Sequence, residues 1–104
     1  MEAMGDLDKK IRELSDRFQR TRYQFLKTEL QTCFAALDMA RFELSIGNTT
    51  VVRREIAAVE KGMSVIRRFL SALPPDQRGE MDANLADLNA ILESVKAGVD
   101  SHCR

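Results

Sequence analysis

A long stretch of the chain, from residue 6 to residue 46, contains no glycine and no proline. Those two residues disfavour a helix interior most strongly, whereas the stretch has many Ala, Leu, Glu and Arg residues, which favour it. A run without glycine or proline folds most readily as one continuous helix. We therefore predict a helix over residues 6–46, about 60 Å long, with Asp6 as its N-cap and Gly47-Asn48 as its stop.

A second, shorter helix is predicted over residues 51–73. Thr49 or Thr50 can cap its start, because a hydroxyl oxygen accepts a hydrogen bond from the first free backbone N–H groups. Pro74-Pro75 ends it, since a proline restricts the residue before it and cannot donate to the helical ladder. The apolar residues of this segment form a broad stripe, which predicts a central position between two other helices.

The third predicted helix covers residues 76–97, and Gly98 would end it and leave residues 98–104 as a tail. Its apolar residues alternate in steps of four and three positions, so they form one narrow stripe that suits packing against a pair of neighbouring helices. The stripe consists of Met81, Leu85, Leu88, Leu92, Val95 and Val99.

These segments predict an all-α fold in one helical domain over residues 1–104, because a chain of this length suits a single core. Residues 49–73 carry five basic and two acidic groups, and residues 74–100 carry two basic and six acidic groups. The two helices therefore attract each other, although each exposed pair contributes only about 0.5 kcal/mol. We expect a long N-terminal helix plus an antiparallel helical hairpin, forming a three-helix bundle. A break near Arg20–Arg22 would instead give four helices.

The predicted hairpin is too short to cover the first helix. Each return helix would span about 33 Å, so the hairpin can lie along only the C-terminal half of the first helix. Apolar residues elsewhere on that helix are then left uncovered, and an isolated amphipathic helix is marginal in water. This predicts a homodimer. The predicted interface consists of Leu7, Ile11, Leu14, Phe18, Phe25, Met39, Phe42 and Ile46.

Two groups of basic residues are candidates for binding nucleic acid or another anion. One is the segment 17–27, which carries Arg17, Arg20, Arg22 and Lys27 and no acid. The other follows the second helix, where basic residues recur every seven positions and two lie close to the free N–H groups of the helix start. The possible anion-binding residues there are Thr50, Arg53, Arg54, Lys61 and Arg68.

The sequence contains few other groups that could carry chemistry. It shows no metal-binding, nucleotide-binding or nucleophile motif, so we predict no catalytic residue, no cofactor and no metal site. The net charge is zero and no apolar run suits a membrane span or a secretory signal, which predicts no membrane association. Cys33 in an apolar segment and Cys103 near the end indicate reduced thiols and a cytoplasmic location.

Together these features predict a non-enzymatic protein–protein interaction module: a homodimeric helical adaptor, scaffold or small chaperone that also binds another protein. The alternative is a helical protein that binds nucleic acid or another anion through the basic face of the second helix and residues 17–27. The hypotheses differ in their response to salt, because contacts to a nucleic-acid backbone weaken steeply as salt rises.

Overall fold

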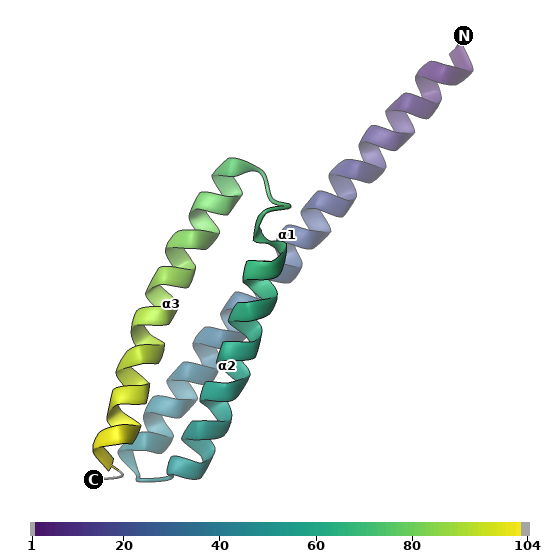
Figure 1. The fold of residues 1–104 in the computed structure, drawn as a ribbon. Coiled ribbons are helices and arrows are strands. Elements are labelled where there is room, and N and C mark those ends of the chain that lie inside the picture. The colour runs from purple at the N-terminus through teal and green to yellow at the C-terminus, as the bar shows by residue number, and fades with distance from the viewer. Residues whose placement is uncertain (1, 103–104) are drawn as a thin grey trace.

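The computed structural model describes residues 2–102 of the chain, with side chains from residue 5 onward. These residues form the helices α1 (Glu2–Ser45), α2 (Thr49–Leu70) and α3 (Pro75–His102), and they contain no strand. The predicted all-α class is therefore confirmed. In Figure 1, α2 and α3 fold back beside the second half of α1, while the first half projects alone.

Helix α1 is continuous, so the alternative of a break near Arg20–Arg22 is wrong for the described residues. It begins at Glu2, which places Asp6 inside the helix rather than at the predicted N-cap. The predicted stop is confirmed. Gly47 has a φ of 78°, a conformation that glycine adopts without strain, and the N–H of Asn48 donates to the carbonyl of Glu43 at 2.9 Å.

Helix α2 begins and ends earlier than predicted. Asn48 caps its start, with the side-chain oxygen accepting a hydrogen bond from the N–H of Val51 at 3.5 Å, so neither threonine is the cap. Its last residue is Leu70, and the chain then turns through Ser71–Leu73 before the prolines. The side chain of Arg78 donates to the carbonyl of Leu73 at 3.0 Å, which satisfies an acceptor in the turn that follows α2.

Helix α3 is longer than predicted, because it runs through Gly98 to His102. The prediction of a tail is wrong over residues 98–102, and residues 103–104 lie outside the described residues. Gly98 serves packing rather than termination. A Cβ at this position would lie 2.5 Å from a methyl carbon of Leu44, so the absence of a side chain lets α3 approach α1 closely.

All three helices contribute to one hydrophobic core, and each helix contacts the other two. The predicted contact of the second helix with both other helices is therefore confirmed, and the first and third helices also contact each other. A close α1–α2 approach occurs at Gly62, which is buried against Cys33, whereas Ala58 is exposed. The buried core residues of α1 are Leu26, Leu30, Cys33, Leu37 and Ala40.

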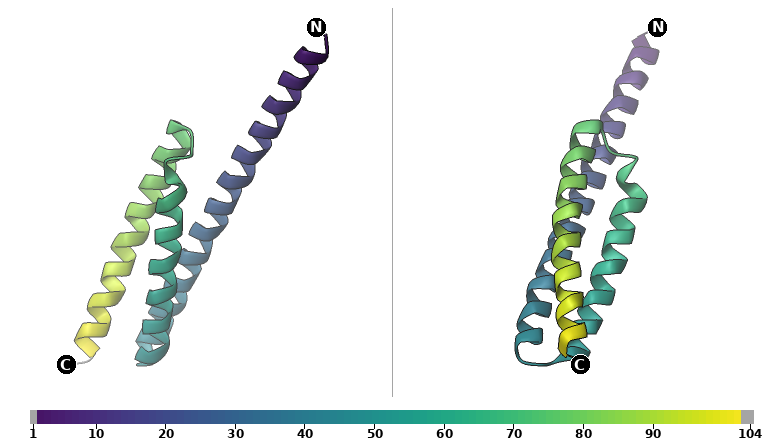
Figure 2. Two further views of the ribbon diagram at one scale, coloured as in Figure 1. Left: turned by 45° about the vertical axis from the view of Figure 1, so that its right-hand side comes forward. Right: turned by 60° about the vertical axis from the view of Figure 1, so that its left-hand side comes forward.

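The molecule is strongly elongated, with extents of 73 × 20 × 16 Å. Its radius of gyration is 19.0 Å, against about 13 Å for a compact chain of this length. The views in Figure 2 agree that the excess length comes from the start of α1, which extends beyond the hairpin. We call residues 5–22 the arm. Every residue in it is exposed.

Candidate functional site

The apolar residues of the arm are largely exposed. Phe18 is the most exposed, at 68%, and among residues 5–45 no core residue precedes Leu26. Hydrophobic side chains spaced along one face of a helix ordinarily pack against a neighbour. The exposed apolar residues in this half of α1 are Leu7, Ile11, Leu14, Phe18 and Phe25.

The second half of α1 also carries exposed apolar residues, although α2 and α3 pack against it. Met39, Phe42 and Ile46 are 51%, 60% and 61% exposed, and Ala35 beside them is exposed as well. Ile46 follows the last residue of α1. All of the residues predicted for a partner interface are therefore accessible in the single chain, and the interface itself stays a prediction.

The two groups are parts of one continuous stripe. Their positions follow alternating steps of four and three residues. Three threonines complete this spacing: Thr21 within the first group, and Thr28 and Thr32 between the two groups. A sustained repeat of seven residues is the pattern of a coiled-coil seam. We call this set the outer stripe, and every member is exposed. It consists of Leu7, Ile11, Leu14, Phe18, Thr21, Phe25, Thr28, Thr32, Ala35, Met39, Phe42 and Ile46.

The residues that pack against the hairpin form a second stripe on nearly the opposite side of α1. Seven-residue spacing places the centres of the two stripes about 150° apart around the helix axis. Covering one stripe therefore leaves the other accessible. The inner stripe consists of Leu26, Leu30, Cys33, Leu37, Ala40 and Leu44.

Thr32 interrupts the outer stripe less strongly than its polarity suggests. The hydroxyl of Thr32 donates to the carbonyl of Thr28 at 2.9 Å, within the same helix. A hydroxyl that is bonded to its own helix can be covered by apolar groups at a smaller cost than an unpaired one.

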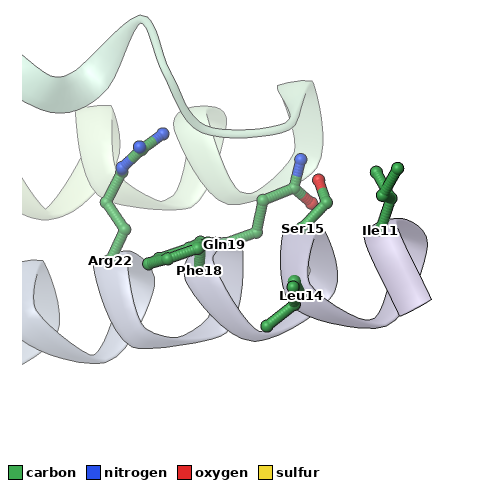
Figure 3. Close-up of a pocket in the computed structure, with 6 residues that line it drawn as sticks. All are labelled: Ile11, Leu14, Ser15, Phe18, Gln19 and Arg22. Atoms are coloured by element: carbon green, nitrogen blue, oxygen red, sulfur yellow. The ribbon is translucent and has the colours of Figure 1, made fainter. Parts of the chain in front are cut away.

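A shallow groove of about 430 Å³ lies along the arm, and all of its lining residues come from α1. Figure 3 shows Phe18 lying along the groove between Leu14 and Arg22, with Ser15 and Gln19 beside it.

A more apolar depression of about 320 Å³ lies where the arm meets the end of α2. Phe69 joins Phe18 and Phe25 in lining it, together with Thr21 and Arg22. Phe69 is 41% exposed and extends the outer stripe sideways onto α2. Phe69 is not among the residues predicted for the interface, because the sequence alone does not show that this end of α2 lies beside Phe25.

The charges beside the outer stripe change sign along α1. Seven-residue spacing places Lys10, Arg17 and Arg22 next to its N-terminal half, with Asp8 as the one acid there. Beside the C-terminal half it places only acids: Glu29, Asp38 and Glu43. The surface is therefore basic at one end and acidic at the other.

Tyr23 marks the point where the hairpin begins to cover α1. Its hydroxyl donates to a carboxylate oxygen of Glu80 at 2.8 Å, and Lys27 lies 5.2 Å from the centre of its ring. The hydrogen bond to Glu80 raises the pKa of the phenol, because the carboxylate favours the protonated form. Tyr23 is half-buried and packs against the core.

Cys33 is buried in the core, as predicted, and is a free thiol. Its sulfur lies 3.9 Å from the carbonyl oxygen of Val59. Burial raises the pKa of the thiol, and the negative charge of Glu29 raises it further. A buried thiol held in its protonated form is a poor nucleophile.

The candidate anion-binding residues do not form one cluster. Thr50 and Arg68 lie on α2 eighteen positions apart, which corresponds to about 27 Å along the helix. Arg53 and Arg54 lie near Thr50 at the start of α2, and Lys61 lies about halfway along the helix. The basic residues of the arm also point in different directions, since their spacing distributes them around α1 rather than along one line.

Within the described residues, no group of three or more His, Cys, Asp or Glu side chains could hold a metal ion. Among the same residues, no helix has the length and apolar character needed to cross a membrane. Comparisons with protein-family models, with curated proteins and with solved structures find no match to this chain.

Proposed function

We propose that this protein is a non-enzymatic protein–protein interaction module that self-associates through the outer stripe of α1. The observation that carries the proposal is the unbroken seven-residue repeat of exposed positions along the whole helix, including Phe18 and Phe42. Such a repeat places apolar side chains where a second helix can cover them in successive layers.

The energetics of the arm support the proposal. Residues 5–22 have no buried side chain, so nothing within the chain offsets the entropy lost when the arm becomes helical. Covering one Phe or Leu side chain contributes about 1.5–3 kcal/mol. Several of these along one partner helix are enough to stabilise both the arm and the complex.

The test is the oligomeric state of purified protein by sedimentation equilibrium, compared with a Phe18→Asp variant. We expect a dimer for the unaltered chain and a monomer for the variant, because an acid in the middle of a covered stripe is costly. Ser64→Asp is the control. It adds the same charge at an exposed position of α2, away from the outer stripe, and should leave the dimer intact. A chain that stays monomeric at high micromolar concentration would refute self-association.

A further inference from the structure

We propose that the second copy runs antiparallel to the first, with Leu7 of one chain opposite Ile46 of the other. This inference rests on the proposed function and adds the orientation and register of the pairing. In this register the numbers of two facing residues, one from each copy, add up to 53. The layers are Leu7 with Ile46, Ile11 with Phe42, Leu14 with Met39, Phe18 with Ala35, Thr21 with Thr32, and Phe25 with Thr28.

This register covers the whole outer stripe. A shift by one heptad in either direction leaves one end of the stripe, around Leu7 or around Ile46, without an opposing residue. The hairpins pack on the inner stripe, on the other side of α1, and reach the outer stripe at Phe69, which lies beside Phe18 and Phe25. Each arm then lies against the half of the second copy that carries α2 and α3.

The side-chain sizes in the layers are complementary. Phe18 faces Ala35 and Phe25 faces Thr28, so a large ring meets a small side chain in both layers. A core packs best when large and small residues alternate across facing positions. A parallel pair in register would instead place each Phe against its own copy and leave three threonine layers in the middle.

Charge favours the antiparallel orientation. In antiparallel coiled coils the flanking positions meet their counterparts of the same type, so Arg17 lies beside Asp38 of the second copy and Arg22 beside Glu29. The twofold symmetry makes each of these pairs occur twice. Among the described residues, none of these four side chains forms an ion pair within the chain. Arg17, Arg22 and Asp38 are exposed, and Glu29 is half-buried beside Gly62.

One pair opposes this arrangement, since Asp8 lies beside Glu43 of the second copy. Glu43 already accepts a hydrogen bond from the side chain of Asn48 at 2.9 Å. A parallel pair is worse, because it places Arg17 beside Arg22 and Asp38 beside Glu43. Every close charged pair is then repulsive.

Charge reversal distinguishes the two orientations, because they predict effects of opposite sign. In the antiparallel dimer, Arg17→Glu places two acids together and Asp38→Arg places two bases together, so each variant should weaken the dimer on the order of tenfold. The double variant Arg17→Glu/Asp38→Arg restores both attractive pairs and should recover most of the affinity. In a parallel dimer, each single reversal would strengthen the association. The control is Arg12→Glu, an exposed reversal on the arm away from the stripe.

The dissociation constants would be measured by sedimentation at low salt, where exposed charge pairs are least screened. Weakening by both single variants with recovery in the double variant is the expected result. Strengthening by either single variant, or no recovery in the double variant, would overturn the antiparallel register while leaving self-association standing. A monomeric unaltered chain would overturn the proposed function as well.

A distance measurement gives an independent test. A spin label would be attached at Lys9→Cys in a Cys33→Ala/Cys103→Ser background. Lys9 lies on the face of the arm away from the outer stripe. In the antiparallel register the two labels are on the order of 50 Å apart along the axis, whereas in a parallel dimer only the helix diameters separate them, about 20 Å. A short distance would exclude the proposed orientation.

Discussion

Gly62 shows how a single missing side chain sets the distance between two helices. It lies in the interior of α2, where glycine ordinarily costs about 1 kcal/mol relative to alanine. A Cβ at this position would lie 2.5 Å from the sulfur of Cys33. The glycine therefore permits the close α1–α2 approach.

We expect Gly62→Ala to lower the free energy of unfolding by about 1–2 kcal/mol, because overpacking outweighs the gain in helix propensity. Urea denaturation followed by circular dichroism would measure it. In a Cys33→Ala background, which removes the opposing sulfur, the same substitution should become neutral or stabilising.

Gly79→Ala is the control for this prediction. Gly79 lies in the interior of α3 with no atom within 4 Å of the position of an added Cβ. Alanine there should stabilise the protein by up to about 1 kcal/mol through helix propensity alone. If Gly62→Ala were as stabilising as Gly79→Ala, the close contact at Cys33 would not limit the packing.

At the scale of the helices, the arm and the bundle are energetically separate parts of α1. From residue 5 onward, every buried core side chain of α1 lies at or after Leu26, and the first half-buried residue is Tyr23. The hydrophobic stabilisation of the bundle therefore does not depend on residues 5–22. The arm depends instead on whatever covers its apolar face.

We predict that a chain lacking residues 1–20 keeps a cooperative unfolding transition, with a free energy of unfolding within about 1 kcal/mol of the monomeric Phe18→Asp variant. It should also lose self-association, because half of the outer stripe is gone. Urea denaturation and sedimentation of the same sample would measure both. An unfolded product would mean that the arm contributes to the stability of the bundle.

The helices themselves were largely predictable from the sequence, because glycine and proline act locally and mark the breaks near Gly47 and Pro74. Helix ends were not always predictable. Gly98 has the local character of a stop, but its contact with Leu44 keeps it inside α3. A tertiary contact of this kind overrides local propensity, and it is invisible until the neighbouring helix is placed.

The exposed apolar residues were also predicted, but their continuity was not. At the 100° per residue of a straight α-helix, the apolar side chains of the arm lie about a quarter turn around the axis from Met39 and Phe42. A repeat of 3.5 residues joins them through Thr21, Thr28 and Thr32. The threonines are polar, so the apolar residues alone do not show the continuous repeat. That a second chain covers the stripe stays a prediction.

At the scale of the whole molecule, shape distinguishes two ways in which the chains could associate. In the antiparallel register the two α1 helices overlap along nearly their full length, so the dimer should be about as long as one chain, which measures 73 Å. If only the arms paired with each other, the dimer would extend beyond about 100 Å.

Small-angle X-ray scattering at dimeric concentrations should therefore give a maximum dimension close to that of the monomeric Phe18→Asp variant, with twice its mass. The variant itself should show a radius of gyration near 19.0 Å. A clearly longer particle would exclude overlap along the whole outer stripe.

The position of α3 in the chain has a consequence for biosynthesis. The inner stripe of α1 is fully covered only when α3 has packed against it. This packing places Glu80 beside Tyr23 and Gly98 beside Leu44. During translation α1 is made first, so it emerges with apolar residues uncovered on both sides until the third helix follows. Nascent chains on one messenger RNA would therefore meet each other while the outer stripe of each α1 is already exposed. This is the stage at which exposed hydrophobic surface is most prone to aggregate.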